Sequence, residues 1–496
     1  MHGVRLNILI PGAFGFGLLF SFDTLLAMAG FGSGYPGLST VPISECASML
    51  CFAIAVFFAE PLDRVIGRSR VLLAGVTTGT IGAAVAFTLL VSGIPQMPLA
   101  VLSEMLIAVF TVCCFLRYYR SFSLRPLTEV VLTLALGHIL SGALLFAVTI
   151  LSVNMLPAIL ALFVPAAVAL LLRRYERECR KSADVSDMEQ AETSAVVANG
   201  IGSAVSGSDS GKLVMLVRPL ALLAVTIFMR GTFSSSILND GIALDFAGVI
   251  ASALFVLLVI RSGGSVIRFK LLYDIAMFSL MAGLFLFALS AAFVSGSETV
   301  SDLSGFFTNA GYVTFDIFFI AILCNSCQRY ALSTVRVFGL VGLVESLVFG
   351  LATFAGTMVS NQPCEVRMIA AFAGALTLAA CYVMLLTDHD YRTAWGTSAD
   401  SEGRPSIADF YYTIPEVCSA LSQQYGLTRR EEEVLILLAQ RKTVPDVETE
   451  LFISNSTAKS HCKSIYRKLG IHKREELLRL VGHPSVDERL ESELRQ

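Results

Sequence analysis

Residues 127–150 read LTEVVLTLALGHILSGALLFAVTI, and the only ionisable side chains in this run are Glu129 and His138. An α-helix needs about 20 apolar residues to cross the roughly 30 Å of hydrocarbon in a bilayer. The run meets this requirement in both length and composition. It therefore predicts a membrane-spanning helix that carries a histidine at membrane depth.

Similar apolar runs lie on both sides of this one. The composition agrees, because 55% of the 496 residues are hydrophobic, only 15% are charged and the mean hydropathy is +0.71, which soluble chains rarely reach. The first run has only Arg5 ahead of it and is followed by further spans, so we expect it to be retained rather than cleaved. About twelve spans in an all-α polytopic bundle are predicted. The other runs are 6–30, 40–59, 71–93, 98–117, 154–173, 213–231, 240–261, 270–295, 305–327, 336–359 and 366–386.

Basic residues are concentrated in alternate loops. Lys and Arg occur in segments such as 64–70, 117–125 and 261–270, whereas the intervening segments 91–97 and 294–303 contain none. The positive-inside rule then places both termini in the cytoplasm, with the chain in the plasma (inner) membrane of the cell.

A long polar interruption divides the spans into two sets of six. Residues 174–212 are rich in Ser, Ala, Gly and acidic residues. This composition predicts a flexible cytoplasmic linker between two six-helix halves. Within the third span, Gly75 and Gly79 have the small-xxx-small spacing that permits close approach of a neighbouring helix.

The loop after the second span reads Asp63-Arg64-Val65-Ile66-Gly67-Arg68-Ser69-Arg70. It is similar to the Asp-Arg-x-Gly-Arg-Arg cytoplasmic loop of the major facilitator superfamily, with one extra residue. With the six-plus-six layout, residues 1–390 resemble that superfamily. The resemblance implies a transporter-like fold in which a small molecule would bind between the two halves.

Ionisable side chains at span depth are costly and usually face the protein interior or a water-filled cavity. Those near span ends, Asp23, Glu45 and Asp245, are interpreted as carboxylates that reach toward water. The others are candidates for a ligand or proton site, and interhelical contacts that only specify packing remain the alternative. The predicted ligand site comprises Asp316, Glu345, Asn309, Glu104 and His138.

The C-terminal region has a different character, with clear signals for helix starts. Thr428 with Glu431 and Thr443 with Asp446 have the spacing of capping boxes, and Ser454 precedes a third helical pattern. A first helix is expected to end near residue 440 and a fourth to cover 473–481, while a helix over 415–425 packs onto them. The stripe expected to be buried on the third helix is Ala458, Cys462, Ile465 and Leu469.

The rest of the third helix carries cations and short polar side chains. Lys can contact both phosphates and guanine acceptors, and Ser lets the backbone approach base edges, so this helix suits a major groove. A solvated basic face is the alternative. The residues predicted to contact DNA are Ser454, Thr457, Lys459, Ser460, Lys463, Arg467 and Lys468.

The region resembles the LuxR-type helix-turn-helix of bacterial transcription regulators, with departures at Ala458 for Val, Arg441 for Gly and Glu448 for Ala. The resemblance implies that the positions of Lys459, Ser460 and Lys463 face bases. It also implies that the fourth helix pairs two copies on DNA, through Leu477, Leu478 and Val481. The family pattern is met by Leu427, Thr428, Arg430, Glu431, Glu433, Val434, Leu435, Ile453, Ser454, Thr457, Lys459, His461, Ile465, Tyr466, Lys468, Leu469 and Gly470.

These features predict a membrane-anchored one-component transcriptional regulator that senses an unknown small molecule and binds double-stranded DNA as a homodimer. A secondary transporter with a regulatory DNA-binding appendage, or a tail that binds a protein partner, remain alternatives. No enzyme motif, cofactor or metal site is expected. The predicted parts are a first membrane half (1–173), a linker (174–212), a second half (213–386), a tether with a helix (387–425), the helix-turn-helix domain (426–482) and a tail (483–496).

Overall fold

A computed structural model describes most of the two predicted membrane halves and much of the helix-turn-helix domain. All regular secondary structure within the described residues is helical, which confirms the all-α prediction. The described residues are 6–28, 43–92, 97–151, 155–194, 216–234, 242–261, 266–292, 298–329, 332–385, 418, 421–422, 425–439, 442–451, 453–471 and 476–477.

A helix lies at each of the twelve predicted spans, and the second of them, α2, is followed by a short helix, α3, across a sharp bend. The first half contains α1 (Leu6–Met28), α2 (Ile43–Phe57), α3 (Ala59–Val65), α4 (Ser69–Ser92), α5 (Met97–Phe122), α6 (Leu127–Leu151) and α7 (Leu156–Ser194). The second half contains α9 (Val217–Ser234), α10 (Ile242–Arg261), α11 (Val266–Ala292), α12 (Glu298–Arg329), α13 (Thr334–Ser360) and α14 (Cys364–Leu385).

Length and composition qualify most of these helices as membrane spans. Within the described residues, nine helices are long and apolar enough, or ten if α2 and α3, which meet at an angle of 92°, form one broken span. The apolar part of α10 is shorter than the rest, at 244–260. A multi-pass helical bundle is therefore confirmed, and the count of twelve stays a prediction.

The predicted linker begins later than expected. Helix α7 continues to Ser194, so the segment 174–194 is helical, and residues 195–212 lie outside the described residues. The polar composition of this segment indicated a linker. Its Ala, Glu, Gln and Met residues nevertheless favour a helix, in water as well as in a protein interior. A pair one turn apart, Lys181 with Glu178 at 2.8 Å, adds local support.

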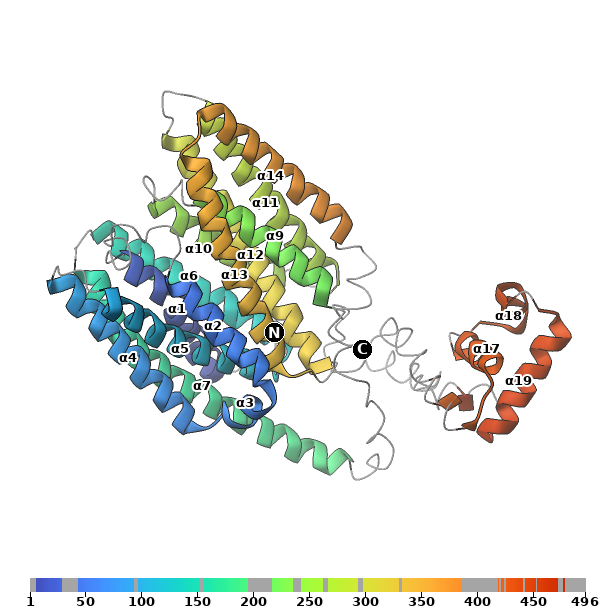
Figure 1. The fold of residues 1–496 in the computed structure, drawn as a ribbon. Helices are drawn as coiled ribbons and strands as arrows, with labels where there is room; N and C mark the ends of the chain where they lie inside the picture. Colours follow the sequence, from blue (N-terminus) through green and yellow to red (C-terminus); the bar gives the residue numbers. More distant parts are fainter. Residues whose placement is uncertain are drawn as a thin grey trace. The chain divides into compact units, whose positions relative to one another are not determined.

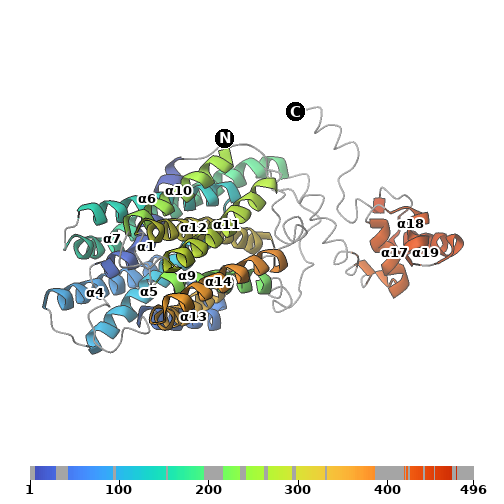
Figure 2. The same ribbon diagram turned by 90° about the horizontal axis from the view of Figure 1, so that it is seen from above.

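The two halves lie side by side, as Figures 1 and 2 show. Within the first half α1 packs on α6 and α7, and α4 packs on α5; within the second half α12 packs on α10 and α11. Between the halves, α2 lies against α13 and α6 against α10. The predicted close approach at Gly79 is confirmed, because a Cβ there would lie 2.5 Å from the ring of Phe110 on α5.

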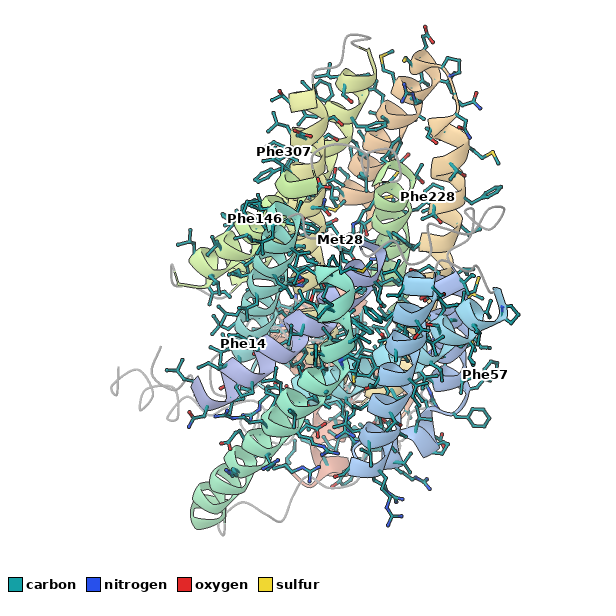
Figure 3. All side chains as sticks on the ribbon, turned by 90° about the vertical axis from the view of Figure 1, so that its left-hand side faces the viewer. Phe14, Met28, Phe57, Phe146, Phe228 and Phe307 are labelled. Atoms are coloured by element: carbon teal, nitrogen blue, oxygen red, sulfur yellow. The ribbon has the colours of Figure 1, made fainter. Side chains whose placement is uncertain are left out.

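Many large apolar side chains point away from the bundle. Phe57 is 86% exposed and Phe14 is 46% exposed, and Figure 3 shows Phe57 projecting clear of the helices. A soluble protein rarely leaves so much contiguous apolar surface in water. These side chains form the surface that lipid would cover.

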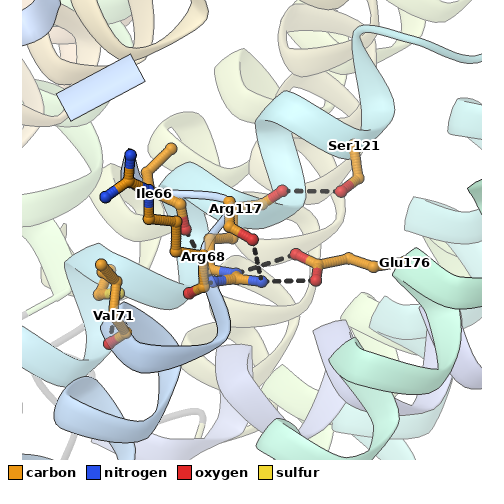
Figure 4. Close-up of polar contacts among 8 residues, drawn as sticks. Ile66, Arg68, Val71, Arg117, Ser121 and Glu176 are labelled. Carbon is orange, nitrogen blue, oxygen red and sulfur yellow. Dashed lines mark hydrogen bonds and ion pairs between the residues drawn. The ribbon is translucent and has the colours of Figure 1, made fainter. Parts of the chain in front are cut away.

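A buried arginine stabilises one end of the first half (Figure 4). We call this end the arginine-rich end, because it carries Arg64, Arg68, Arg70, Arg117, Arg120 and Arg125. The sequence placed Arg117 in a loop, but α5 continues to Phe122 and the Arg117 side chain is buried. Its guanidinium donates hydrogen bonds to the carbonyl oxygens of Ile66 at 2.7 Å and Arg68 at 2.9 Å, and its Nε donates to Glu176 Oε1 on α7 at 2.9 Å. Arg117 thus joins α5, α7 and the loop that resembles the superfamily signature.

We predict that Arg117→Ala destabilises the membrane bundle by about 3 kcal/mol or more, because it leaves the carboxylate of Glu176 and the buried carbonyl oxygen of Ile66 without the arginine. The measurement is thermal unfolding of the full chain in detergent. Arg117→Lys keeps the charge but loses the planar fork, so it should recover only part of the stability. Unfolding temperatures equal to that of the unchanged protein would contradict the assigned role.

The C-terminal domain forms a separate compact unit with its own core. It contains α17 (Arg429–Ala439), α18 (Val444–Leu451) and α19 (Asn455–Leu469). The described positions of the helix expected over 415–425, which are 418, 421, 422 and 425, are helical, as are residues 476 and 477 of the fourth. The core consists of Cys418, Val434, Leu435, Leu438, Ala439, Val447, Ala458, Ile465, Leu469, Ile471 and Leu477.

Candidate DNA-binding surface and intramembrane polar network

The predicted recognition helix, α19, has well-defined ends. Ser454 is its N-cap, in an extended conformation, and its hydroxyl accepts a hydrogen bond from the backbone N–H of Thr457 at 3.2 Å. Gly470 ends the helix in the left-handed region, with φ of +69°, which side chains with a Cβ adopt at a cost. The start expected from the sequence, with Ser454 as the cap, is thereby confirmed.

One face of α19 is buried and the other is open to solvent. Ala458, Ile465 and Leu469 are buried as predicted, and Cys462 is partly buried against the same core. The exposed face, which we call the cationic face, carries five of the residues predicted to contact DNA. They are Thr457, Lys459, Ser460, Lys463 and Arg467.

Lys468 lies in a different environment from the residues of the cationic face. Its Nζ donates to Glu431 Oε2 at 2.7 Å and to the carbonyl oxygen of Gly426 at 2.9 Å. Ser464 donates to the other oxygen of Glu431 at 2.6 Å, and the backbone N–H of Thr428 donates to Oε2 at 2.7 Å. Glu431 therefore joins α17 to α19, in addition to the capping box that the sequence predicted.

These hydrogen bonds stabilise the ionised form of Glu431. Burial alone would raise the pKa of its carboxyl, since the side chain is only 7% exposed, but the bonds from Lys468, Ser464 and Thr428 outweigh burial and lower the pKa to about 2. The carboxylate thus stays charged at any physiological pH. It holds Lys468 within the domain, on the side of α19 that packs on α17.

A second carboxylate fixes α18 against α19. Glu448 stands where the family pattern has Ala, and its Oε2 accepts a hydrogen bond from Asn455 Nδ2 at 2.8 Å. The second predicted capping box is also present, because the backbone N–H of Thr443 donates to Asp446 at 2.6 Å. The turn between the two DNA-binding helices is thus held by contacts that α18 and α19 make with one another.

The residues expected to pair two copies are only partly described. Leu477 is fully buried in the core of a single domain, where it packs with the helices described above. Its side chain therefore contributes to folding of the domain rather than to an open surface. Leu478 and Val481 lie outside the described residues.

Within the membrane bundle, the predicted ligand residues separate into two groups. His138 on α6 and Asp316 on α12 form one contact, with Nε2 and Oδ2 3.3 Å apart. Glu345 on α13 interacts electrostatically with Asp316 and accepts a hydrogen bond from the hydroxyl of Tyr312 at 3.2 Å. The guanidinium of Arg230 lies over the ring of Tyr312, 3.7 Å from its centroid.

The other predicted residues lie beside this network. Glu104 interacts with Asp23, and Glu45 interacts with both of them and with Glu345. Two of the three carboxylates that were expected to reach toward water, Asp23 and Glu45, are therefore part of the same polar region. Asn309 lies near Asp245, which in turn interacts with Arg230.

Arg230 and Tyr312 were missed in the sequence. Arg230 had a usable signal, because it is a basic residue near the end of a span where the positive-inside rule predicts none. Tyr312 had no such signal, since a tyrosine among Phe, Val and Thr on a membrane helix is typical of ordinary packing.

Comparison with known proteins supports both parts. The family described as bacterial regulatory proteins, luxR family, matches residues 425–481. Spore germination protein GerE of Bacillus subtilis (strain 168) is 45% identical over 58 residues, which are 11% of this chain and 78% of that protein. The C-terminal domain is thus a helix-turn-helix DNA-binding domain. Through it, the chain belongs to the luxR family of bacterial regulatory proteins.

The membrane bundle is similar to solved transporter structures. The proton:xylose symporter XylE of the major facilitator superfamily aligns with a TM-score of 0.52 and 12% identity, over 77% of this chain and 95% of that one. A bacterial homologue of the iron transporter ferroportin, in an outward-facing state with soaked iron, aligns with a TM-score of 0.51 and 13% identity, over 77% and 98%. These likenesses confirm the transporter-like fold.

We predict that Glu431→Gln weakens the C-terminal domain by about 1–3 kcal/mol at pH 7, because Lys468 and Ser464 lose a charged acceptor. The pKa of Glu431 is lowered from 4.5 to about 2 on folding, so its stabilising contribution is complete above pH 4.5 and is lost as the pH falls toward 2. The difference between the variant and the unchanged protein should therefore shrink in acid.

The measurement is urea-dependent pulse proteolysis of the full chain, with thermolysin at pH 7 and pepsin at pH 3, in which fragments of residues 425–477 are followed by mass spectrometry. Glu432→Gln on the same helix is the matched control and should have little effect at either pH. If Glu431→Gln lost as much stability at pH 3 as at pH 7, this would contradict the role of ionised Glu431 as the acceptor for Lys468 and Ser464.

Proposed function

We propose that this protein is a membrane-anchored one-component transcriptional regulator, in which the bundle senses a small molecule and the C-terminal domain binds promoter DNA in the cytoplasm. The observation that carries the proposal is the cationic face of α19, which is open to solvent on an independently packed helix-turn-helix domain. This domain is joined in one chain to a bundle with a transporter fold.

In this proposal α19 enters the major groove. Lys459, Ser460 and Lys463 face base edges, while Thr457 and Arg467 contact the phosphate backbone, as does Ser454 at the N-terminus of the helix. All of these side chains are exposed.

Lys468, which the sequence assigned to DNA, instead holds the recognition helix in place through Glu431. Two copies bind one operator, and their pairing surface would involve Leu478 and Val481, whereas Leu477 anchors the fourth helix.

The sensing part of the proposal rests on the polar network between the halves. Charged groups inside a membrane protein usually mark a binding or conduction path, and transporter folds place this path between their two halves. The distribution of Arg and Lys supports a cytoplasmic position for the arginine-rich end and for both termini, as the positive-inside rule predicts. A bound molecule alters DNA binding only through unequal affinity for two arrangements of the bundle.

A secondary transporter with a DNA-binding appendage is the second candidate, and the same intramembrane carboxylates favour it. Flux into vesicles separates the two candidates. A transporter would lose flux in Asp316→Asn and Glu345→Gln proteins. A regulator would change promoter activity in these variants without catalysing flux.

We predict that the double variant Lys459→Ala and Lys463→Ala loses promoter occupancy in cells while its amount in the membrane stays the same. Chromatin capture with the tagged full chain measures the occupancy. In nanodiscs, DNA affinity should fall by at least about tenfold, since a specific base contact contributes about 1–3 kcal/mol. The slope of the logarithm of the DNA association constant against the logarithm of the salt concentration should become shallower by about 0.9 for every phosphate that is no longer neutralised.

Arg429→Ala provides the matched control, because Arg429 is 96% exposed but lies on α17, away from the cationic face. It should leave occupancy nearly unchanged. Equal losses in this control and in the double variant would indicate unspecific attraction between the domain and DNA. Salt-independent binding of the full chain, or none, would favour a protein partner for the C-terminal domain.

A further inference from the structure

The contact between His138 and Asp316 joins the two halves of the bundle at mid-depth. His138 belongs to α6 of the first half, and Asp316 belongs to α12 of the second half. Their Nε2 and Oδ2 atoms lie 3.3 Å apart. A rearrangement that moves α6 away from α12 at this depth would lengthen or break this contact.

The surroundings of His138 make Asp316 important to it. The imidazole has no exposed surface, and its ring lies edge-on to Phe20 with centroids 4.5 Å apart, next to Phe16 at 5.9 Å. Neither ring nitrogen has a hydrogen-bond partner among the described residues, so the 3.3 Å approach of Nε2 to the Asp316 carboxylate is the polar contact of the imidazole there. An imidazole enclosed by aromatic rings loses much of its polar stabilisation when that carboxylate moves away.

Asp316 faces a more polar region. Its side chain is 16% exposed, and it interacts electrostatically with Glu345. Glu345 accepts a hydrogen bond from the hydroxyl of Tyr312, and the guanidinium of Arg230 lies over the Tyr312 ring. Tyr119 on α5 also lies near Asp316 and Glu345. Asp316 thus stands between a buried partner in the first half and a network in the second half that the proposed ligand would enter.

Other contacts between the halves lie at the arginine-rich end. The hydroxyl of Ser333, the N-cap of α13, donates to Asp63, and the side chains of Ser123 and Thr334 are 3.1 Å apart. Arg336 approaches Glu60 at 3.4 Å. These contacts are made by other residues than the pair at mid-depth, but they join the same two halves, so movement of the halves would disturb both sets.

From this geometry we propose that His138 and Asp316 form a latch between the two halves, and that the sensed molecule releases it by engaging Asp316. The inference rests on the proposed sensing function. A ligand that presents a positively charged or hydrogen-bond-donating group to Asp316 takes the place of His138. The halves then leave the arrangement described here, and the presentation of the C-terminal domains to DNA changes.

The test is hydrogen–deuterium exchange of the full chain in detergent, without added ligand, for Asp316→Asn, His138→Asn and the double variant. Each single change should accelerate exchange by about tenfold in peptides that cover 60–70 and 332–338, where the halves also meet. The double variant should add little to either single change, because both remove the same contact. Exchange within α4, which packs on α5 and α7 of its own half, should stay the same.

The matched control is Asp274→Asn, which removes the charge of a carboxylate on α11 that accepts a 2.8 Å hydrogen bond from the hydroxyl of Tyr382 on α14 within one half. It removes a membrane-domain carboxylate without touching the contact between halves. The latch is overturned if the control accelerates exchange at 60–70 and 332–338 as much as Asp316→Asn does, if the effects of the single variants simply add, or if exchange rises uniformly through the bundle.

Promoter occupancy separates failure of the latch from failure of the proposed function. The latch predicts that Asp316→Asn and His138→Asn shift occupancy in the same direction without ligand. Altered exchange with unchanged occupancy would overturn its regulatory role, whereas the Lys459 and Lys463 result would still support a regulator. If the lysine variants kept full promoter occupancy, the proposed function would be overturned, whereas the exchange result would still support the latch.

Discussion

Charged side chains that lie among hydrocarbon must find partners within the protein, and the membrane bundle depends on this constraint. Arg117 meets it with two backbone carbonyls and Glu176, and it thereby joins α5, α7 and the loop at 66–68. Arg230 meets it over the ring of Tyr312. The buried polar ring of His138 contacts Asp316 across the interface of the two halves. The first contact braces one half, whereas the last can break when the halves move.

The C-terminal domain uses a charged partner for a different purpose. Glu431 collects donors from α17 and α19, so the recognition helix is held at a fixed angle before DNA arrives. A rigid helix loses little conformational freedom on binding, which leaves more of the contact energy for affinity. The contact between Glu448 and Asn455 extends the same bracing to α18. The cationic face is thereby separated from the charges that stabilise the fold.

Much of the fold was predictable from the sequence because its signals are local. Apolar runs of about 20 residues marked the helices of the bundle, and capping residues such as Ser454 marked the helices of the domain. The extension of α7 to Ser194 was not predicted, because a polar segment rich in Ala and Glu suits a helix and a linker alike. Pairing between distant residues could not be predicted in the same way. Lys468 and Glu431 are 37 positions apart, so helical periodicity assigned Lys468 to the polar side without revealing its partner. Hydropathy likewise identified His138 and Asp316 as candidates but not as a pair, because depth along a span does not specify which neighbouring helix a side chain faces.

Regulation of transcription requires that the cationic face and the chromosome lie on the same side of the membrane. The most direct measurement is protease accessibility of a tag placed after Gln496, in intact spheroplasts and after lysis, with an independent periplasmic-side tag for comparison. We expect a tag that is protected in intact spheroplasts and cleaved after lysis. Cleavage in intact spheroplasts would place the helix-turn-helix domain outside the cell and contradict the proposed regulator.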